Sequence, residues 1–293
     1  MAVFYALAGA VFYALASVLQ QREAADAPAH QSLRVSLLLG LVRRPVWLAG
    51  VVADLVGFAF EALALHSGPL SLVQPLLTVG LVFALGMGAM MAGRALTRRD
   101  WTGAIAVTGG LVLFLTQTTV DSGRQFASDR DWLAAGLAIA GLSALCLVAS
   151  RLWATGSWAS VLLATATGLV FALSAGLTKT ATFFLSQSVT ELLTSWEFYA
   201  LVAVGLTSMV LAQSAFQSGS LRDTLPALTI VPPAASLLLG VVLFDEHLRV
   251  SGLGIPVAIV GVLLALGGLL ALSTSPLAAA AYGSRPDEKR VEA

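Results

Sequence analysis

Charge and cysteine are the two things of which this chain has little. Only 11% of its 293 residues are charged and its formal net charge is zero, whereas a typical soluble domain is about 25% charged. A neutral chain lacks the basic surface that nucleic-acid binding requires, so we expect no nucleic-acid partner. The single cysteine, Cys146, excludes an internal disulfide and a metal site built from several cysteines.

Motifs of soluble catalysis are also missing from the sequence. It contains no Walker A loop, no glycine-rich dinucleotide-binding turn and no HExxH pair, and no nucleophile stands in a convincing pairing with a histidine. We therefore expect a protein that is not an enzyme and that carries no cofactor.

Apolar residues take the place of charge. They make up 58% of the chain, and the mean hydropathy is +0.88. A membrane-spanning helix needs about 20 mainly apolar residues. The sequence predicts an all-α, multi-pass protein of the cell (plasma) membrane, with the lipid bilayer as a partner and about nine spans: 2–20, 46–66, 69–92, 100–118, 131–149, 158–178, 197–217, 222–244 and 250–272.

An internal repeat relates the two halves of the chain at an offset of 151 positions. The first span also resembles the sixth, because Gly9 and Gln20 have the spacing of Gly168 and Lys179. Five spans separate the partners, so they would cross the membrane in opposite directions, as in the inverted repeats of secondary transporters. The residues paired at this offset are Ser67 with Ser218, Gly68 with Gly219, Leu70 with Leu221, Pro75 with Pro226, Leu77 with Leu228, Gly103 with Gly254, and Gly110 with Gly261.

The repeat and the loop charges predict one topology. Lysine and arginine gather on the cytoplasmic side of membrane proteins. With the N-terminus outside, only Arg124, Arg130, Lys179 and Arg249 of the 16 lysines and arginines lie on the outer side. We expect a first repeat at 1–130 with an interfacial segment at 31–42, a connector helix and loop at 131–157, a second repeat at 158–275, and a charged cytoplasmic tail at 276–293.

Three stretches resemble known transporters. The first resembles the NIPA-type magnesium transporters of the drug/metabolite transporter superfamily, and it consists of Trp47, Ala49, Gly50, Gly57, Pro69, Val73, Pro75 and Leu76. The sixth span, with Gly168 and Lys179, is similar to the helix of that family that ends in a lysine. The run 243–248, Leu-Phe-Asp-Glu-His-Leu, followed by Gly254 and Gly261, resembles the ending of EamA proteins. The resemblance implies a transporter fold and passage of Mg²⁺. Phe58 stands where the NIPA pattern has an acidic residue, and Glu61 follows one turn later.

Two carboxylates inside the second span are the first candidates for transport. Asp54 and Glu61 are seven positions apart, so they share one helix face with Gly50 and Gly57. Small residues allow another helix to approach closely, which would turn the acids toward the interior of the bundle. The pair can bind a cation, exchange a proton or hold a cationic amine, and it can equally serve as a structural pair. The metal, if there is one, stays unknown, with Asp54 and Glu61 as its candidate ligands.

Further polar residues accompany the acids. Gln213 and Gln217 lie four apart on one face of the seventh span, where they can contact a solute or hold helices together. Lys179 is expected at an outer helix end, where it can contact a solute or snorkel.

Four prolines and two glycines are expected to break helices or shape the turns between them. Pro75, Pro226, Pro232 and Pro233 predict helix breaks at membrane depth, which occur where the backbone is buried in protein or lines a cavity. Gly68 and Gly219 predict tight turns or close approaches.

The sequence favours a secondary-type transporter that moves a small metabolite or drug-like solute by alternating access. A divalent-cation transporter of the NIPA type is the alternative, and a non-transporting membrane scaffold is the second alternative. The sequence leaves open whether the protein forms a homodimer.

Overall fold

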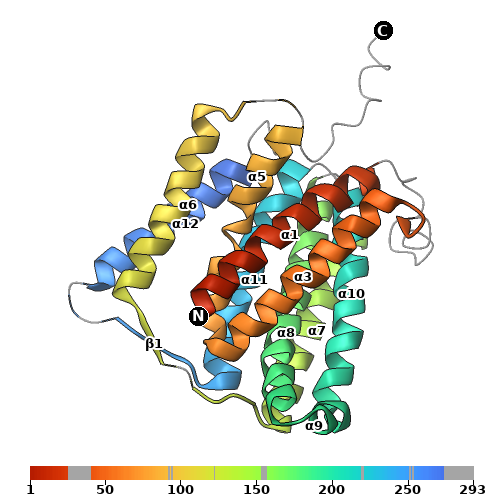
Figure 1. Ribbon diagram of the computed structural model, residues 1–293, viewed down its shortest axis with the longest axis vertical. Coiled ribbons are helices and arrows are strands. Elements are labelled where there is room, and N and C mark those ends of the chain that lie inside the picture. Colours follow the sequence, from red (N-terminus) through yellow and green to blue (C-terminus); the bar gives the residue numbers. More distant parts are fainter. Residues whose placement is uncertain are drawn as a thin grey trace.

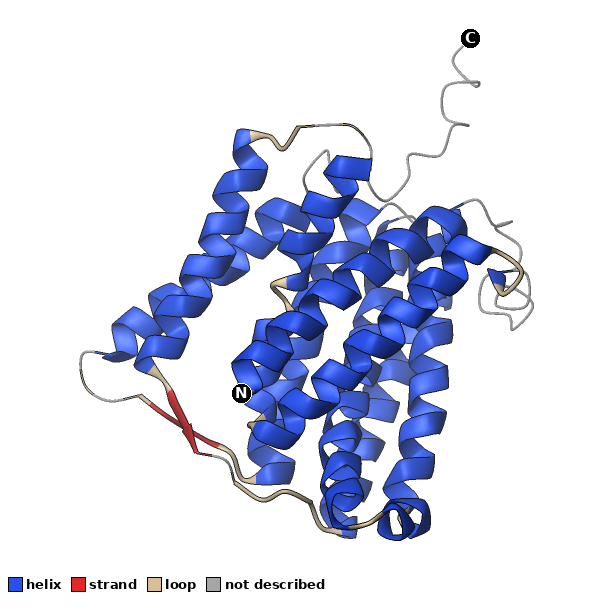
Figure 2. Cartoon of the chain, viewed as in Figure 1, coloured by secondary structure: helices blue, strands red, loops and turns tan. Residues whose placement is uncertain are grey.

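The computed structural model describes residues 1–25, 41–91, 93, 95–121, 123–152, 157–218, 221–250, 252 and 254–273, and this part of the chain is almost entirely helical (Figures 1 and 2). Two short strands, β1 and β2, form an antiparallel ribbon in which Val120 lies opposite Leu248. The elements are α1 (Ala2–Ala25), α3 (Pro45–Ser67), α4 (Leu70–Leu77), α5 (Gly80–Met91), α6 (Arg98–Gln117), β1 (Thr119–Asp121), α7 (Asp129–Leu152), α8 (Ser157–Gln187), α9 (Val189–Thr194), α10 (Trp196–Ser218), α11 (Leu221–Phe244), β2 (His247–Arg249) and α12 (Gly254–Ser273).

Seven helical stretches of the described chain are long and apolar enough to cross a membrane. Many large apolar side chains on the helices are exposed, among them Leu55, Ile105 and Leu137, as expected of helices that face lipid. The protein is therefore a polytopic membrane protein. Of the other predicted spans, 197–217 is represented by a shorter apolar stretch, Trp196–Ala212, and 100–118 by α6, which begins with charged residues. The seven stretches are Ala2–Gln20, Pro45–Ser67, Leu70–Met91, Asp129–Leu152, Trp158–Gln187, Ala227–Phe244 and Gly254–Leu272.

Local sequence signals explain where several helices begin. Pro45 occupies the first turn of α3, where its missing N–H costs nothing. Thr97 begins α6 with a reciprocal capping box: its hydroxyl accepts from the Asp100 amide, and the Asp100 carboxylate accepts from the Thr97 amide at 2.7 Å. Ser188 caps α9 by accepting from the Glu191 amide at 3.0 Å. These signals determine where the helices begin but not which helices pack together.

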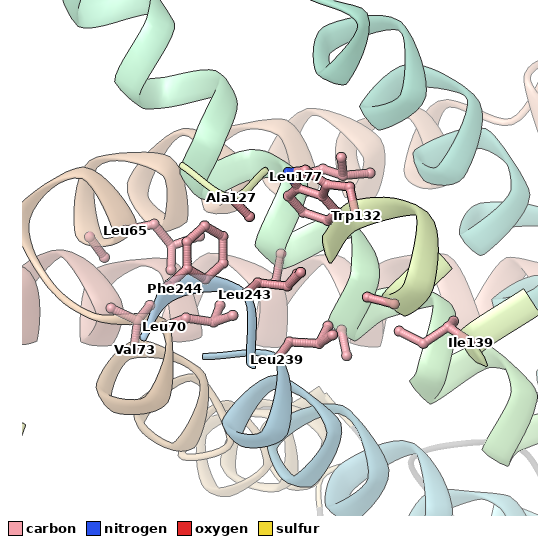
Figure 3. Packing of buried hydrophobic residues seen from close by; sticks show 14 of the residues in the cluster. Leu65, Leu70, Val73, Ala127, Trp132, Ile139, Leu177, Leu239, Leu243 and Phe244 are labelled. Carbon is pink, nitrogen blue, oxygen red and sulfur yellow. The ribbon is translucent and has the colours of Figure 1, made fainter. Parts of the chain in front are cut away.

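The helices pack in pairs and small groups (Figure 1). Helix α1 crosses α3, while α8 contacts α7, α10 and α11. Helices α6 and α12 form a pair of their own. A hydrophobic core packs between α3, α4, α7, α8 and α11. Figure 3 shows members of this core, among them Leu65, Leu70, Trp132, Leu177 and Phe244.

The predicted breaks at proline are correct at one position only. The segment predicted as 69–92 divides into α4 and α5 three residues after Pro75, through a tight turn in which Thr78 and Val79 donate to the carbonyls of Pro75 and Leu76. By contrast, α11 runs without a break through Pro226, Pro232 and Pro233. The helix breaks expected at those three prolines are therefore wrong.

Three other expectations meet the structure as follows. The sixth predicted span, 158–178, extends as α8 to Gln187, so Lys179 lies inside a helix and not at its end. Most of the interfacial segment 31–42 and all of the tail 276–293 lie outside the described residues. Gly219 also lies outside them.

Candidate functional site

The face of α3 that carries Asp54 and Glu61 packs against α1. A Cβ atom added to Gly57 would lie 2.9 Å from a ring carbon of Tyr13, and one added to Gly50 would lie 2.8 Å from the Cγ of Gln20. Two glycines on α3 therefore make room for two polar side chains of α1, which reach the acids.

Glu61 is the centre of a buried hydrogen-bonded cluster. Its side chain is only 8% exposed. The hydroxyl of Tyr13 donates to Oε2, and the amide Nε2 of Gln74 donates to Oε1 at 2.6 Å. Three helices, α1, α3 and α4, thus meet at one carboxylate, and both of its oxygens have neutral donors.

Asp54 lies two turns away on the same face and is half-buried. It accepts a hydrogen bond from the side chain of Gln20. Both acids therefore sit at the α1–α3 contact, each held by side chains of α1. We call Tyr13, Gln20, Asp54, Glu61 and Gln74 the carboxylate cluster.

The carboxylate cluster can carry positive charge. Carboxylates accept hydrogen bonds or bind cations, and a membrane interior favours neutralising them with a proton, a metal ion or a cationic group. Within the described residues, no three histidine, cysteine or acidic side chains come together as a metal site. Cavities of about 290 Å³ and 330 Å³ lie elsewhere, the first along Val52, Ala59 and Leu63 of α3, and the second beside Trp196 and Glu197.

A buried ion pair forms a second polar cluster. Lys179 Nζ lies 2.5 Å from Glu246 Oε1, and the two side chains are 1% and 0% exposed. The ammonium also lies 4.4 Å from the centroid of the Phe244 ring, close enough for a cation–π contact. The helix-end position expected for Lys179 is therefore wrong: the side chain does not snorkel, because α8 continues past it to Gln187 and Glu246 neutralises it in the interior.

Glu246 also caps a helix of the other half of the chain. Its Oε1 accepts from the Leu70 amide at 2.7 Å, and its Oε2 accepts from the Ser71 amide at 2.9 Å. These amides begin α4 and have no partner within the helix, and the helix dipole favours a negative charge there. We call Lys179, Glu246 and these two amides the ion-pair cluster.

Helix α4 joins the two clusters. Its first amides bind Glu246, and its Gln74 side chain binds Glu61 one turn later. Sequence reasoning missed Tyr13, Gln74 and Glu246. Gln74 and Glu246 left a signal, a polar residue within or directly after an apolar segment, but Tyr13 is indistinguishable from an ordinary apolar-face aromatic.

The remaining candidates are placed as follows. Gln213 and Gln217 lie on α10, and Pro226 lies on α11, but the side chains of these three fall outside the described ones. Pro232 packs near Gly168 of α8, where an added Cβ would lie 3.0 Å from the proline ring. Gly68 ends α3 in ordinary extended backbone with φ −163°, and its added Cβ would lie 2.7 Å from the Cβ of Ala2. Gly68 therefore serves a close approach and not an unusual backbone conformation.

Comparison with known proteins identifies a relative without a known function. No family model matches the chain, and no solved structure matches it. The chain is 30% identical over 256 residues to an uncharacterized protein of Corynebacterium glutamicum, across 85% of this chain and 86% of that protein. The chain belongs to the same family as this Corynebacterium glutamicum protein.

Proposed function

We propose that this protein is a secondary-type transporter that moves a small metabolite or drug-like solute across the cell membrane by alternating access. The observation that carries the proposal is the contact between α6 and α12, two helices that the sequence repeat relates to each other. Transporters built from inverted repeats bind their solute between the repeats and rock one repeat against the other.

The contact between α6 and α12 supports an inverted repeat. An added Cβ on Gly110 would lie 2.5 Å from the Gly261 carbonyl oxygen, and these two glycines are repeat partners. On one side of this pair, a Cβ added to Gly268 would lie 2.7 Å from the Gly103 carbonyl oxygen. On the other side, a Cβ added to Gly254 would lie 3.1 Å from the Gln117 side-chain oxygen. The 151-residue offset turns Gly103 into Gly254 and Gln117 into Gly268, so it exchanges the flanking contacts. Antiparallel helices related by a two-fold axis would show such an exchange around a central pair, which is why the contact supports the proposal.

A second pair of contacts supports the same repeat. In the first half, an added Cβ on Gly80 would lie 3.0 Å from the Ala10 carbonyl oxygen of α1. In the second half, an added Cβ on Gly168 of α8 would lie 2.8 Å from Val231 of α11. Val231 lies 151 positions after Gly80 (231 − 80), whereas Gly168 lies 159 positions after Gly9 (168 − 9), the neighbour of Ala10, in the match between the first and sixth spans. The proposal therefore includes nine spans, arranged as four, a connector (α7) and four, with the N-terminus outside.

In this proposal the carboxylate cluster carries the positive charge that accompanies transport. Asp54 and Glu61 have neutral donors in Tyr13, Gln20 and Gln74, so binding a proton or a cationic solute would neutralise charge that the bilayer disfavours. Mg²⁺ is the alternative cargo. It prefers octahedral oxygen ligands and keeps several waters, whereas here both oxygens of Glu61 already accept hydrogen bonds, so we favour an organic solute coupled to a gradient.

The test is flux through purified protein in proteoliposomes. A pH-sensitive dye and a magnesium-sensitive dye are read side by side, while a panel of small metabolites and drug-like amines is added under an imposed pH gradient. We expect solute-dependent proton movement in the wild type, lost in Asp54→Asn and in Glu61→Gln. Glu191→Gln, which changes an exposed acid on α9, is the matched control and should transport normally.

Three results would contradict the proposal. A magnesium signal without proton movement would identify the divalent-cation alternative, and the absence of any flux would favour a scaffold. Normal flux in both carboxylate variants, in protein of unchanged stability, would remove Asp54 and Glu61 from the transport pathway.

A further inference from the structure

We propose that the ion-pair cluster is a latch that closes one end of the transport pathway by holding the N-terminus of α4, an inference that rests on the proposed function. The latch joins three elements drawn from both halves of the chain: Lys179 on α8, Glu246 after α11, and the first amides of α4. Motion of one half against the other must break or move these contacts.

The chemistry of the pair suits a latch better than a permanent brace. Removing two charges from water is unfavourable, and their mutual attraction only partly offsets this cost, so well-packed apolar residues often stabilise a core as well or better. Here the core around the pair is already apolar, with Leu70, Leu177 and Leu243 at 2% exposure or less. A fully buried pair with directed hydrogen bonds instead holds one arrangement specifically, and a competing arrangement that hydrates both charges can replace it.

Helix α4 is a short element that is separate from α5. It has only eight residues, and the tight turn at Thr78 and Val79 separates it from α5. Pro75 has no N–H and therefore removes one backbone hydrogen bond inside it. Two of the three side-chain contacts of Glu246, those with the Leu70 and Ser71 amides, thus act directly on this short element.

The two positions that the repeat relates to Lys179 and Glu246 do not form an ion pair. The repeat partner of Lys179 is Gln20, and the position 151 residues before Glu246 is Ala95. Gln20 bonds Asp54 instead, and Ala95 is exposed. Among the described residues near Gln20, Arg44 pairs with Glu23 at 3.0 Å, and both side chains of this pair are partly exposed. The fully buried ion pair of the described chain therefore lies at the Lys179 end, where it biases the resting protein toward closure.

The latch also reaches the carboxylate cluster. Gln74 stands one turn along α4 from the amides that Glu246 holds, and it donates to Glu61 at 2.6 Å. Release of α4 would withdraw this donor from Glu61. Opening of the latch and the charge state of Glu61 would thereby influence each other.

The experiment measures access to a buried position beside the latch. Ser71 is 0% exposed, and its amide binds Glu246. Ser71→Cys is introduced into a Cys146→Ser background, which removes the sequence's single cysteine, and the protein is reconstituted in lipid nanodiscs. The labelling rate with a membrane-impermeant maleimide is then compared with and without the neutral pair Lys179→Met plus Glu246→Gln.

We expect the neutral pair to raise the labelling rate of Ser71→Cys by about tenfold, because the rate follows the fraction of protein in which the latch is open, and we expect that fraction to rise about tenfold. Ser143→Cys, at a buried serine on α7 (5% exposed), is the matched control and should label at an unchanged rate. An unchanged rate at Ser71→Cys, or an equal rise at Ser143→Cys, would overturn the latch, because the pair would then be a brace or its loss would loosen the whole fold.

A second variant decides the question if the neutral pair does not fold. A Cβ on Gly240 would lie 2.5 Å from Glu246 Oε2, so Gly240→Ala keeps both charges and displaces the carboxylate. It should raise the Ser71→Cys rate in the same direction, whereas Gly205→Ala, with nothing within 4 Å of its added Cβ, should not. Equal rates in these two variants would overturn the latch. The labelling experiment does not depend on transport. If the variants open the latch but the wild type shows no flux, the proposed transporter function is rejected and the latch is not. If the wild type shows flux but the variants do not raise labelling, the latch is rejected and the transporter function is not.

Discussion

Gly110 and Gly261 bring the backbones of α6 and α12 into contact. A Cβ on Gly110 would lie 2.5 Å from both the Gly261 carbonyl oxygen and the Ala265 amide nitrogen, and one on Gly261 would lie 2.7 Å from the Gly110 carbonyl oxygen. No flexible side chain can move aside at this point. The pair therefore determines how closely the two helices approach.

Gly110→Ala should destabilise the protein because the added methyl group meets backbone atoms and must push the helices apart. Overpacking of this kind costs about 1–3 kcal/mol, measured as a lower midpoint of thermal unfolding in detergent. Gly109→Ala, one position along α6 with nothing within 4 Å of its added Cβ, is the control and should unfold at or above the wild-type temperature. Equal midpoints for the two variants would show that the contact is looser than described.

A compensating pair of substitutions should reveal the close approach at Gly68. Gly68→Ala places a methyl group 2.7 Å from the Cβ of Ala2 on α1 and should lower the unfolding midpoint. Ala2→Gly removes the opposing methyl group, so the double variant should recover most of the loss. Failure of Ala2→Gly to restore stability would place the strain elsewhere.

Tyr13→Phe should leave one oxygen of Glu61 without its donor. A hydrogen bond to a charged group contributes about 1.5–3 kcal/mol, so the free energy of unfolding should fall by that order. Tyr5→Phe, on the same helix and in ring contact with Phe60, is the control and should change it less. A Tyr13→Phe variant as stable as Tyr5→Phe would mean that Tyr13 adds nothing to the carboxylate cluster.

Reporter fusions should test the proposed topology. With nine spans and the N-terminus outside, a reporter inserted after residue 43 and one at residue 290 should both read cytoplasmic, because lysine and arginine mark the cytoplasmic side and are present both near residue 43 and in the tail. A cytoplasmic N-terminus would mean that residues 1–45 cross the membrane twice and that the span count is wrong.

Sequence periodicity was enough to place Gly50, Asp54, Gly57 and Glu61 on one face of α3, because 100° per residue is a local property of any helix. That the partner is α1, and that Tyr13 supplies a donor, depends on which helices meet. Local sequence was misleading at Lys179. The weaker hydropathy of 180–190 predicts that the helix ends near Lys179, yet α8 continues to Gln187.

The sequence by itself determined that this is a polytopic helical membrane protein, because apolar segments of spanning length have no stable place in water and lipid requires every backbone group to be bonded internally. Only the tertiary structure decided which charges meet. Glu246 finds Lys179 and the start of α4 from 67 and more than 170 positions away, and such pairings follow from helix packing, which no local pattern encodes. It likewise decided which prolines break a helix: α4 ends soon after Pro75, while α11 stays continuous through three prolines because neighbouring helices support it.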